Sequence, residues 1–513
     1  MFQAVDEDLS DWVSRAGAGN TAGADPALVG AGTWLDWRQS LEKGGVELVE
    51  TPENIIDIVW TEENGRPPNM FKDVVVYDMK YAGVEWTEKV SSLRDQLRDY
   101  SGMVVSELDE LAWLFNLRGE GESNNEGLFN TPVFQSLALV THQELLLWLH
   151  LDQVSEEVRQ HLVSVNMRVE IRDLEHSVTD LTQWFSLHPG NHSVLLTSPS
   201  TYQTGVSWSV YSAVPDQRAS LQTSPIINMK AVKNSVEEAS MIETHIRDAV
   251  AVCDWAGFME KQILETNSVW TEMSAAELLS EYRLEQEECR GDSFSTISAY
   301  ASNGAIIHYS ATPETDARLG NQSLFMVDSG GQYLGGTTDI TRTFHYGAPT
   351  QDMITRYTEV LQGAVELARV IVPNNTQDTS VDLATRQFLF RQGLDYRHGT
   401  GHGVGAYLDV HEGPIWLRMR NSAGEPGELR PGIFFSDEPG YYQSGDWGLR
   451  LETVLRVVEA DLPHSEYGVF IKFEPVTLVP FEPKLINFSM LSSEQIDWLN
   501  DYNKMIRDTV GPR

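Results

Sequence analysis

From Phe325 to Thr343 the chain reads Phe-Met-Val-Asp-Ser-Gly-Gly-Gln-Tyr-Leu-Gly-Gly-Thr-Thr-Asp-Ile-Thr-Arg-Thr. One carboxylate lies on each side of the glycine-rich turn residues. The apolar run Phe325 to Val327 predicts a short buried strand that ends at Asp328. Ile340 to Phe344 alternates apolar and polar residues like a second strand. A hairpin would bring Asp328 and Asp339 together. Two acids held so close repel each other unless a proton or a cation lies between them, so the pair predicts a metal site.

By composition alone, two acids in a hairpin are more often solvated surface charges, but motifs further along the chain favour a metal site. These motifs are His398-Gly-Thr-Gly-His402-Gly-Val-Gly, His411-Glu-Gly-Pro, Ser436-Asp-Glu438-Pro-Gly-Tyr-Tyr and Gly448-Leu-Arg-Leu-Glu452. Apolar runs beside Glu438 and Glu452 predict acids carried on buried strands, and such acids cost free energy unless they are paired. Two Asp, one His and two Glu form an oxygen-rich set that suits hard or borderline divalent ions.

In this order the motifs resemble the metallopeptidases of the pita-bread fold, and specifically the Xaa-Pro aminopeptidase (aminopeptidase P) family. The matching elements are Asn303-Gly-Ala-Ile-Ile-His308-Tyr, Asp328-Ser-Gly, Thr338-Asp-Ile-Thr-Arg-Thr343, His398-Gly-Thr-Gly-His402-Gly-Val-Gly, His411-Glu-Gly-Pro, Asp437-Glu-Pro-Gly-Tyr-Tyr442 and Arg450-Leu-Glu452. A lone Asp-Ser-Gly would be weak evidence. Seven elements in family order, between residues 303 and 452, make a specific match.

The resemblance assigns a role to each polar residue of these motifs. It implies five metal ligands: Asp328, Asp339, His402, Glu438 and Glu452. Of these, Asp339 and Glu452 would bridge two ions. It implies a group of residues that face the substrate or support the ligands: His308, His398, His411, Arg450 and Tyr442. The catalytic residues would be Glu438, which moves a proton, together with His398 and His411.

The resemblance also implies the cofactor and the reaction. Two divalent ions would activate a hydroxide that attacks the carbonyl group preceding a proline. The product would be the free N-terminal residue of a peptide with proline at its second position. The family implies Mn²⁺, and one imidazole with four carboxylates is also compatible with Co²⁺ or Zn²⁺.

The predicted fold class is α/β (α+β), with a creatinase-like middle domain followed by a C-terminal pita-bread catalytic domain. A chain of 513 residues is too long for one core. Residues 1–70 are interpreted as a remnant of the family's first N-terminal domain and a partly structured connector, most of that first domain being absent. Residues 71–226 form the middle domain, and Ser224-Pro225 marks its end. Residues 227–513 form the catalytic domain.

Periodicity predicts several individual elements. Trp86, Val90, Leu93 and Leu97 recur at helical spacing. The runs 137–140 and 145–149 predict paired strands, and 103–105 predicts a short buried strand. A long helix is predicted to begin after Ser224-Pro225, with Asn234 or Ser235 as its N-cap.

Charge and composition exclude several classes of partner. A formal charge of −38 argues against nucleic acid, because a phosphate backbone would be repelled. No apolar run is long enough to cross a membrane. Cys253 and Cys289 are too few for a disulfide framework and are expected to be free thiols. The start of the chain lacks a signal peptide pattern, so the predicted location is the cytoplasm. An extracellular or membrane-anchored protein is the alternative if the termini are incomplete, and the resemblance allows a homodimer.

Three alternatives share parts of the motif set. A prolidase, which cleaves only Xaa-Pro dipeptides, has the same ligands but usually lacks so long a middle domain. A methionine aminopeptidase also has the five ligands, but it is far shorter and lacks the His-Gly-Thr-Gly-His segment. A pita-bread domain that has lost its metal serves as a peptide-binding module. That third interpretation predicts substituted ligands, whereas all five are intact here.

Overall fold

A computed structural model describes residues 8–51, 53–66, 72–121, 130–165, 167–266, 268–419, 426–464 and 466–513. The chain divides into two compact units. One consists of Met1–Tyr77, Glu85–Gly121 and Val133–Ile226, and the other of Asp78–Val84, Glu122–Pro132 and Ile227–Arg513. The predicted division into residues 1–70, 71–226 and 227–513 stays a prediction, and its first boundary lies in residues 67–71, outside the described ranges.

The first unit is built on a mixed six-stranded sheet in the order β10-β9-β4-β6-β7-β8. Its strands are β4 (Gly102–Val105), β6 (Ser136–Thr141), β7 (Leu145–Leu149), β8 (Val169–Asp173), β9 (Val194–Thr197) and β10 (Ala219–Gln222). The pairs that β4 and β7 make with β6 are antiparallel, and the other pairs are parallel. The predicted strand pair at 137–149 and the strand at 103–105 are confirmed.

The helices of the first unit bury apolar side chains. They are α5 (Trp86–Gln96), α6 (Leu108–Leu114), α7 (Glu156–His161), α8 (Ser177–Leu187) and α9 (Trp208–Ser212). The predicted helix at Trp86 is confirmed: Trp86, Val90 and Leu93 are buried. In the core, Trp34 stacks on Trp208 with ring centroids 5.3 Å apart.

Residues 8–66 have more regular structure than the glycine- and alanine-rich sequence predicts. They form α1 (Leu9–Ala16), β1 (Thr21–Ala24), α2 (Ala31–Lys43), β2 (Glu47–Glu50) and α3 (Ile55–Val59), and β1 pairs with β2 in parallel. Trp34 on α2 enters the core cluster of the first unit. Tertiary burial of α2 therefore overrides a weak local pattern.

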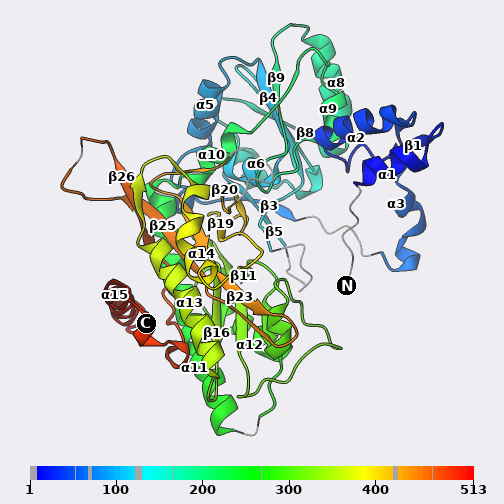
Figure 1. Ribbon diagram of the computed structural model, residues 1–513. Coiled ribbons are helices and arrows are strands. Elements are labelled where there is room, and N and C mark those ends of the chain that lie inside the picture. The colour runs from blue at the N-terminus through cyan, green and yellow to red at the C-terminus, as the bar shows by residue number, and fades with distance from the viewer. Residues whose placement is uncertain are drawn as a thin grey trace. The chain divides into compact units, whose positions relative to one another are not determined.

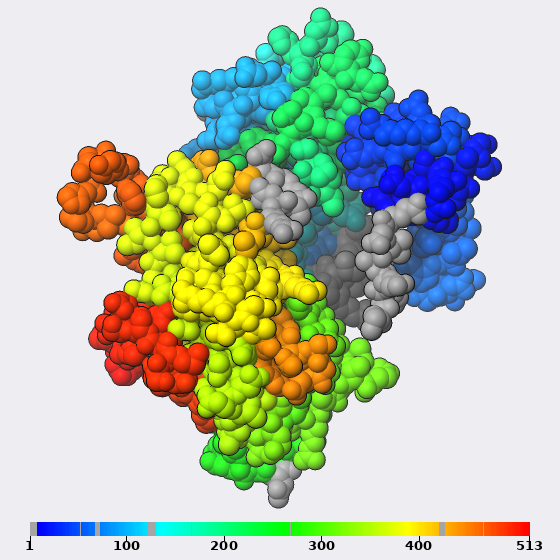
Figure 2. Space-filling view, in the orientation of Figure 1, coloured from blue at the N-terminus to red at the C-terminus, as the bar shows by residue number. Residues whose placement is uncertain are grey.

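The second unit carries long helices (Figure 1). They are α11 (Ser235–Glu265), α12 (Glu272–Leu284), α13 (Gln351–Ala368), α14 (Asp382–Phe390) and α15 (Ser493–Thr509). Of the two residues predicted as N-cap, Asn234 caps α11, and its side chain accepts hydrogen bonds from the backbone of Val236 and Glu237 in a capping box. Figure 2 shows α15, in red, at the molecular surface.

Two sheets of the second unit carry the polar motifs. One is antiparallel throughout, in the order β17-β26-β25-β22-β19-β20, and the other has the order β12-β13-β16. The strands of the first are β17 (Ile371–Pro373), β19 (Gly401–Gly403), β20 (Glu412–Leu417), β22 (Phe434–Asp437), β25 (Thr453–Glu459) and β26 (Phe470–Pro475). Those of the second are β12 (Ile297–Tyr300), β13 (Phe325–Ser329) and β16 (Ile340–Phe344). The predicted mixed α/β fold class is confirmed.

Candidate metal centre

The two aspartates of the opening stretch lie on a hairpin. Strands β13 and β16 pair antiparallel, with Asp328 opposite Thr341 and Asp339 immediately before β16. The connection is more regular than predicted, because β14 (Gly331–Tyr333) and β15 (Gly336–Thr337) form a small hairpin of their own. The turn itself is confined to Leu334 and Gly335. The hairpin places both carboxylates at one end of the β13–β16 ladder.

The remaining predicted ligands come from the antiparallel β17-β26-β25-β22-β19-β20 sheet of the second unit and from its edges. His402 is the middle residue of β19, Glu438 follows the last residue of β22, and Glu452 lies between β24 (Trp447–Arg450) and β25. Glycines flank His402 because the backbone of neighbouring strands leaves no room for side chains. A Cβ at Gly401 would lie 1.7 Å from the Ser436 carbonyl oxygen. Close strand packing thus requires glycine at the positions beside His402 in this motif.

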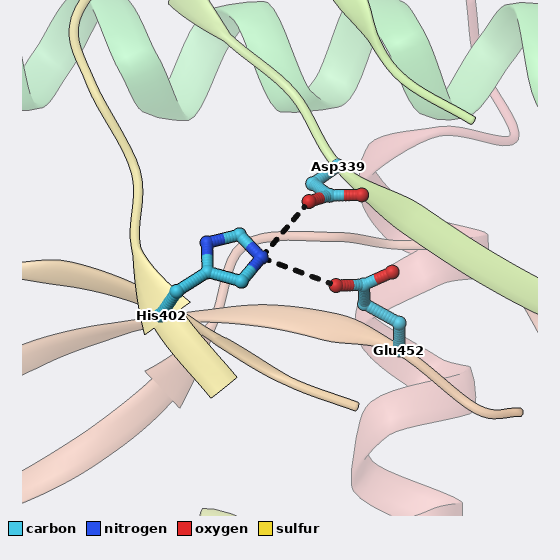
Figure 3. A group of neighbouring side chains, drawn as sticks. All are labelled: Asp339, His402 and Glu452. Atoms are coloured by element: carbon cyan, nitrogen blue, oxygen red, sulfur yellow. Dashed lines mark ion pairs between the residues drawn. The ribbon is translucent and has the colours of Figure 1, made fainter. Parts of the chain in front are cut away.

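Asp339, His402 and Glu452 converge, with one ligand atom from each lying within 4.8 Å of the others. Figure 3 shows these side chains pointing toward one another. The Nε2 atom of His402 is 3.3 Å from Asp339 Oδ2, 4.0 Å from Glu452 Oε1 and 3.6 Å from Glu438 Oε1. Four of the five predicted ligands therefore lie close together: His402 provides the imidazole nitrogen, and Asp339, Glu438 and Glu452 surround it.

Asp328 joins this group through a buried arginine. Arg450 donates a hydrogen bond from Nη2 to Asp328 Oδ2, another from Nη1 to Tyr442 Oη at 2.8 Å, and a third from Nε to Thr341 Oγ1 at 3.2 Å. The same hydroxyl of Thr341 donates to Glu452 Oε2 at 2.8 Å. Arg450 thus contacts Asp328 directly, and Tyr442 is linked to the ligand group through Arg450.

The carboxylates repel one another strongly. Burial, and then the charges of Asp328 and Glu438, raise the pKa of Asp339 well above its ordinary value. Burial and the charges of Asp339 and Asp328 do the same to the pKa of Glu452. Burial and the charge of Glu452 raise the pKa of Glu438. A cation among these groups would remove this cost.

The proton position on His402 and the unpaired oxygens of the aspartates suit a metal ion. The Nδ1 atom of His402 lies 3.0 Å from the Gly403 carbonyl oxygen, which only accepts, so Nδ1 carries the proton. The lone pair on Nε2 then faces the carboxylates. Among the described residues, Oδ1 of Asp328 and Oδ1 of Asp339 are buried without a hydrogen-bond partner. One imidazole nitrogen and several carboxylate oxygens suit borderline and hard divalent ions. The residues present therefore fit a divalent metal.

The three histidines predicted to face the substrate differ in how closely they approach the ligand group. His398 Nε2 is 2.9 Å from the hydroxyl oxygen of Tyr442, and its Nδ1 is 3.9 Å from Glu438 Oε2. The ring of His411 lies 4.2 Å from that of His402. His308 is exposed and follows the 3₁₀ turn Ala301–Ala305. The structure gives His308 no hydrogen bond or ion pair with any described residue.

The histidines at the ligand group are neutral. Burial, followed by the charge of Arg450, lowers the pKa of His398 to about 3. Repulsion between the protonated forms of His402 and His411, followed by burial, lowers the pKa of His411 to about 3. Burial lowers the pKa of His402 to about 4. All three rings are therefore uncharged imidazoles near pH 7 in the metal-free protein.

Replacing His398 with glutamine is expected to make folding stability less dependent on pH. The folded-state pKa of about 3 lies below the ordinary value of 6.5, so unfolding takes up a proton between these values. Stability is therefore lost progressively as the pH falls from about 6.5, by about 1.4 kcal/mol per pH unit for one such group. Denaturant unfolding of the metal-free protein across this pH range measures the slope.

A matched control for this prediction is His464→Gln, because the side chain of His464 is 77% exposed. The control is expected to keep the slope of the parent protein. An unchanged slope in the His398→Gln variant would contradict the prediction.

Sequence reasoning missed a buried network that holds the loop of His398. Arg386 on α14 donates from Nη2 to the His398 carbonyl oxygen at 2.7 Å and from Nε to Asp382 Oδ2 at 2.7 Å. The hydroxyl of Thr400 donates to Asp382 Oδ1, and the carbonyl of Thr400 accepts from the backbone N–H of Glu438 at 2.8 Å. The i,i+4 pair Asp382–Arg386 was the available sequence signal. Nothing local indicates that such a pair is buried.

Comparisons with known proteins agree with this architecture. The model of metallopeptidase family M24 matches residues 239–459, that of the creatinase/prolidase N-terminal domain matches residues 65–237, and that of the C-terminal region of peptidase M24 matches residues 469–513. The chain is 37% identical over 502 residues to Xaa-Pro aminopeptidase 2 of Rattus norvegicus, covering 96% of this chain and 71% of that protein. It is also 37% identical over 506 residues to a probable Xaa-Pro aminopeptidase P of Aspergillus oryzae, covering 97% and 75%.

Solved structures give the same result. The X-prolyl aminopeptidase of Caenorhabditis elegans, described as a cytosolic enzyme with a di-nuclear active site, superposes with a TM-score of 0.91 at 31% identity. The match covers 100% of this chain and 81% of that one. An Xaa-Pro dipeptidase of Bacillus anthracis, 18% identical with a TM-score of 0.59 over 78% of this chain and 99% of its own, shares the fold. The predicted creatinase-like and pita-bread domains are confirmed, and the chain belongs to metallopeptidase family M24 and, within it, to the Xaa-Pro aminopeptidases.

Proposed function

We propose that this chain is a metal-dependent aminopeptidase that hydrolyses the bond before proline at the second position of a peptide and so removes the N-terminal residue. The observation that carries the proposal is the convergence of Asp339, His402 and Glu452 within 4.8 Å, in a chain related over nearly its whole length to Xaa-Pro aminopeptidases. The dipeptidase alternative is not favoured, because the Xaa-Pro aminopeptidase structure superposes much better than the dipeptidase does.

The proposed ligands hold two divalent ions, in agreement with the di-nuclear site of the related Caenorhabditis elegans enzyme. They are Asp328, Asp339, His402, Glu438 and Glu452. When bound, two such ions lower the pKa of a water molecule and polarise the substrate carbonyl. We assign Mn²⁺ as the native metal, because the donor set is rich in carboxylate oxygen, and Co²⁺ and Zn²⁺ are the competitors to test.

The side chains around the ions have separate proposed roles. Glu438 takes a proton from the attacking water and delivers it to the proline nitrogen, because its carboxylate belongs to the ligand group and its pKa is raised by burial and by Glu452. His398 and His411 face the substrate as neutral rings. We assign the hydrogen bond to the developing oxyanion to His411, because both ring nitrogens of His398 are engaged by Gly399 and Tyr442. His308 contributes from the exposed segment beside them.

Arg450 and Tyr442 position these groups. The Nδ1 atom of His398 lies 2.7 Å from the Gly399 carbonyl oxygen and therefore carries the proton, which leaves Nε2 to accept the hydroxyl proton of Tyr442. The oxygen of Tyr442 in turn accepts from Arg450, which also binds Asp328. One chain of hydrogen bonds therefore sets the orientation of a substrate-facing histidine and of a metal ligand.

The substrates proposed are peptides with proline at the second position. No helix in the described part of the chain is long and apolar enough to span a membrane. We propose a cytosolic location, in line with the cytosolic enzyme from Caenorhabditis elegans. The homodimer stays a prediction.

The test is hydrolysis of Arg-Pro-Pro compared with Arg-Ala-Ala, in metal-stripped protein with and without added Mn²⁺. Release of free arginine only from the proline peptide, and only after metal is restored, is the expected result. Absence of cleavage in protein that binds two ions would refute the proposed activity, and absence of metal binding would leave the peptide-binding module as the better description.

A further inference from the structure

Arg342 is a buried cation beside the metal centre that the proposed mechanism does not use. It lies on β16, three residues after Asp339, and its side chain is 2% exposed. Its guanidinium stands over the ring of Phe481, 4.3 Å from the ring centroid. This ring belongs to the segment that follows β26 and leads toward α15.

The guanidinium of Arg342 is hydrogen-bonded only to carbonyl and hydroxyl oxygens among the described residues. Its acceptors are the carbonyl oxygens of Thr341, Glu452, Val479 and Pro480 and the hydroxyl oxygens of Thr453 and Tyr502. None of the described carboxylates forms an ion pair with this guanidinium. A buried charge without a counter-ion is costly, so its hydrogen bonds must hold a geometry that an apolar side chain could not hold.

On one side, Arg342 holds together the two segments that carry the proposed bridging ligands. Its Nη1 donates to the carbonyl of Thr341, at 2.9 Å, and to the carbonyl of Glu452. These segments also bind each other directly, since Glu452 N–H donates to the Thr341 carbonyl at 2.9 Å. The backbone position of Glu452 is therefore fixed from two directions.

On the other side, the same guanidinium binds the C-terminal segment. Its Nη2 donates to the Val479 carbonyl at 2.8 Å and to the hydroxyl oxygen of Tyr502 on α15 at 3.0 Å. The Tyr502 hydroxyl lies 2.8 Å from the Thr477 carbonyl and 3.0 Å from that of Val479, so it donates back into this segment. Tyr502 itself is 1% exposed. Tyr502 on α15 is thereby linked to the backbone of Glu452 through the side chain of Arg342.

We propose that Arg342 and Tyr502 are a positioning pair through which the C-terminal helix holds Glu452 in the position from which it would bind metal. The inference rests on the proposed metal centre and adds α15 to it. A lysine at position 342 keeps the charge but loses the planar fork that reaches both segments at once. Metal affinity, rather than substrate binding, is therefore the property that depends on the pair.

The test uses the full chain with Arg342→Lys, Tyr502→Phe and the double substitution. Metal affinity is measured by titrating the metal-free protein with Mn²⁺ and counting bound ions by elemental analysis. Loss of groups that orient metal ligands typically weakens metal binding about 10–100-fold. We expect a loss in this range for Arg342→Lys, a smaller one for Tyr502→Phe, and KM for Arg-Pro-Pro within about twofold of the parent value at saturating metal.

The double variant separates a linked pair from two independent structural residues. If Tyr502 acts through Arg342, Mn²⁺ affinity in the double variant is expected to equal that of Arg342→Lys alone, whereas independent effects would multiply. The matched control is Arg283→Lys, which alters an equally buried arginine whose partner is Asp248. The control is expected to lower the melting temperature of the metal-free protein and leave metal affinity unchanged.

Two results would overturn the inference. One is parental metal affinity in folded Arg342→Lys protein, and the other is multiplicative effects in the double variant. Failure of the parent protein itself to bind two ions would instead refute the proposed function, so the two failures are distinguishable.

Discussion

Asp339→Asn is expected to abolish cleavage of Arg-Pro-Pro and to release at least one of the two metal ions. Burial and two neighbouring acids raise the pKa of Asp339, and its Oδ2 lies 3.3 Å from His402 Nε2. An amide keeps the shape but removes the charge that balances the cations. Because loss of outer-shell partners already costs about 10–100-fold, we expect kcat to fall by more than about 100-fold. Steady-state kinetics and elemental analysis of the purified variant measure both effects.

The control for this substitution is Asp352→Asn on α13, where the aspartate side chain is 59% exposed and pairs only loosely with Arg356. That variant is expected to retain parental metal content and kcat, because an exposed ion pair contributes little. Retention of two ions and of normal kcat by Asp339→Asn would remove Asp339 from the metal centre.

Glu438→Gln is expected to lower kcat by about 10²–10⁴-fold, the usual contribution of general acid–base catalysis. The amide cannot accept the proton of the attacking water or pass one to the proline nitrogen. The pH dependence of kcat at saturating Mn²⁺ distinguishes this role from metal binding alone. In the variant, the limb of the profile that reports the catalytic carboxylate should disappear.

Glu474→Gln is a suitable comparison, because Glu474 lies on β26 and pairs with Arg456 and Lys472 away from the ligand group. Its kcat and pH profile are expected to match those of the parent protein. A Glu438→Gln variant with two bound ions and an unaltered pH profile would show that another group moves the proton.

Local signals in the sequence were sufficient for much of the scaffold. Asn234 caps α11, and the alternation from Ile340 to Phe344 corresponds to β16. Each depends on residues a few positions apart, which is the range over which capping and periodicity act. The same locality explains the missed β1–α2–β2 segment, because its glycines and alanines carry no strong periodicity, and the contacts that stabilise it, such as the burial of Trp34, are with distant residues.

The ordered motifs of the sequence also determined the family and the kinds of ligand. The sequence could not determine their positions in space. His402 and Asp339 meet only because the β13–β16 hairpin and β19 belong to one folded unit, and Gly401 permits the close approach of Ser436 that places His402. Burial then raises the pKa of the carboxylates and lowers that of the histidines, an effect that no residue pattern records.

The residues that hold the metal ligands in place could be identified only from the tertiary structure. Arg342 looks in the sequence like one more polar residue of a strand, yet its acceptors lie 110 residues away at Glu452 and 160 residues away at Tyr502. Hydrogen bonds between such distant segments exist only after the sheet and α15 have packed, because closing loops of this length depends on the whole core and not on local preference. The sequence alone therefore determined which chemical groups the site uses, and tertiary packing determined which of them meet and what holds them there.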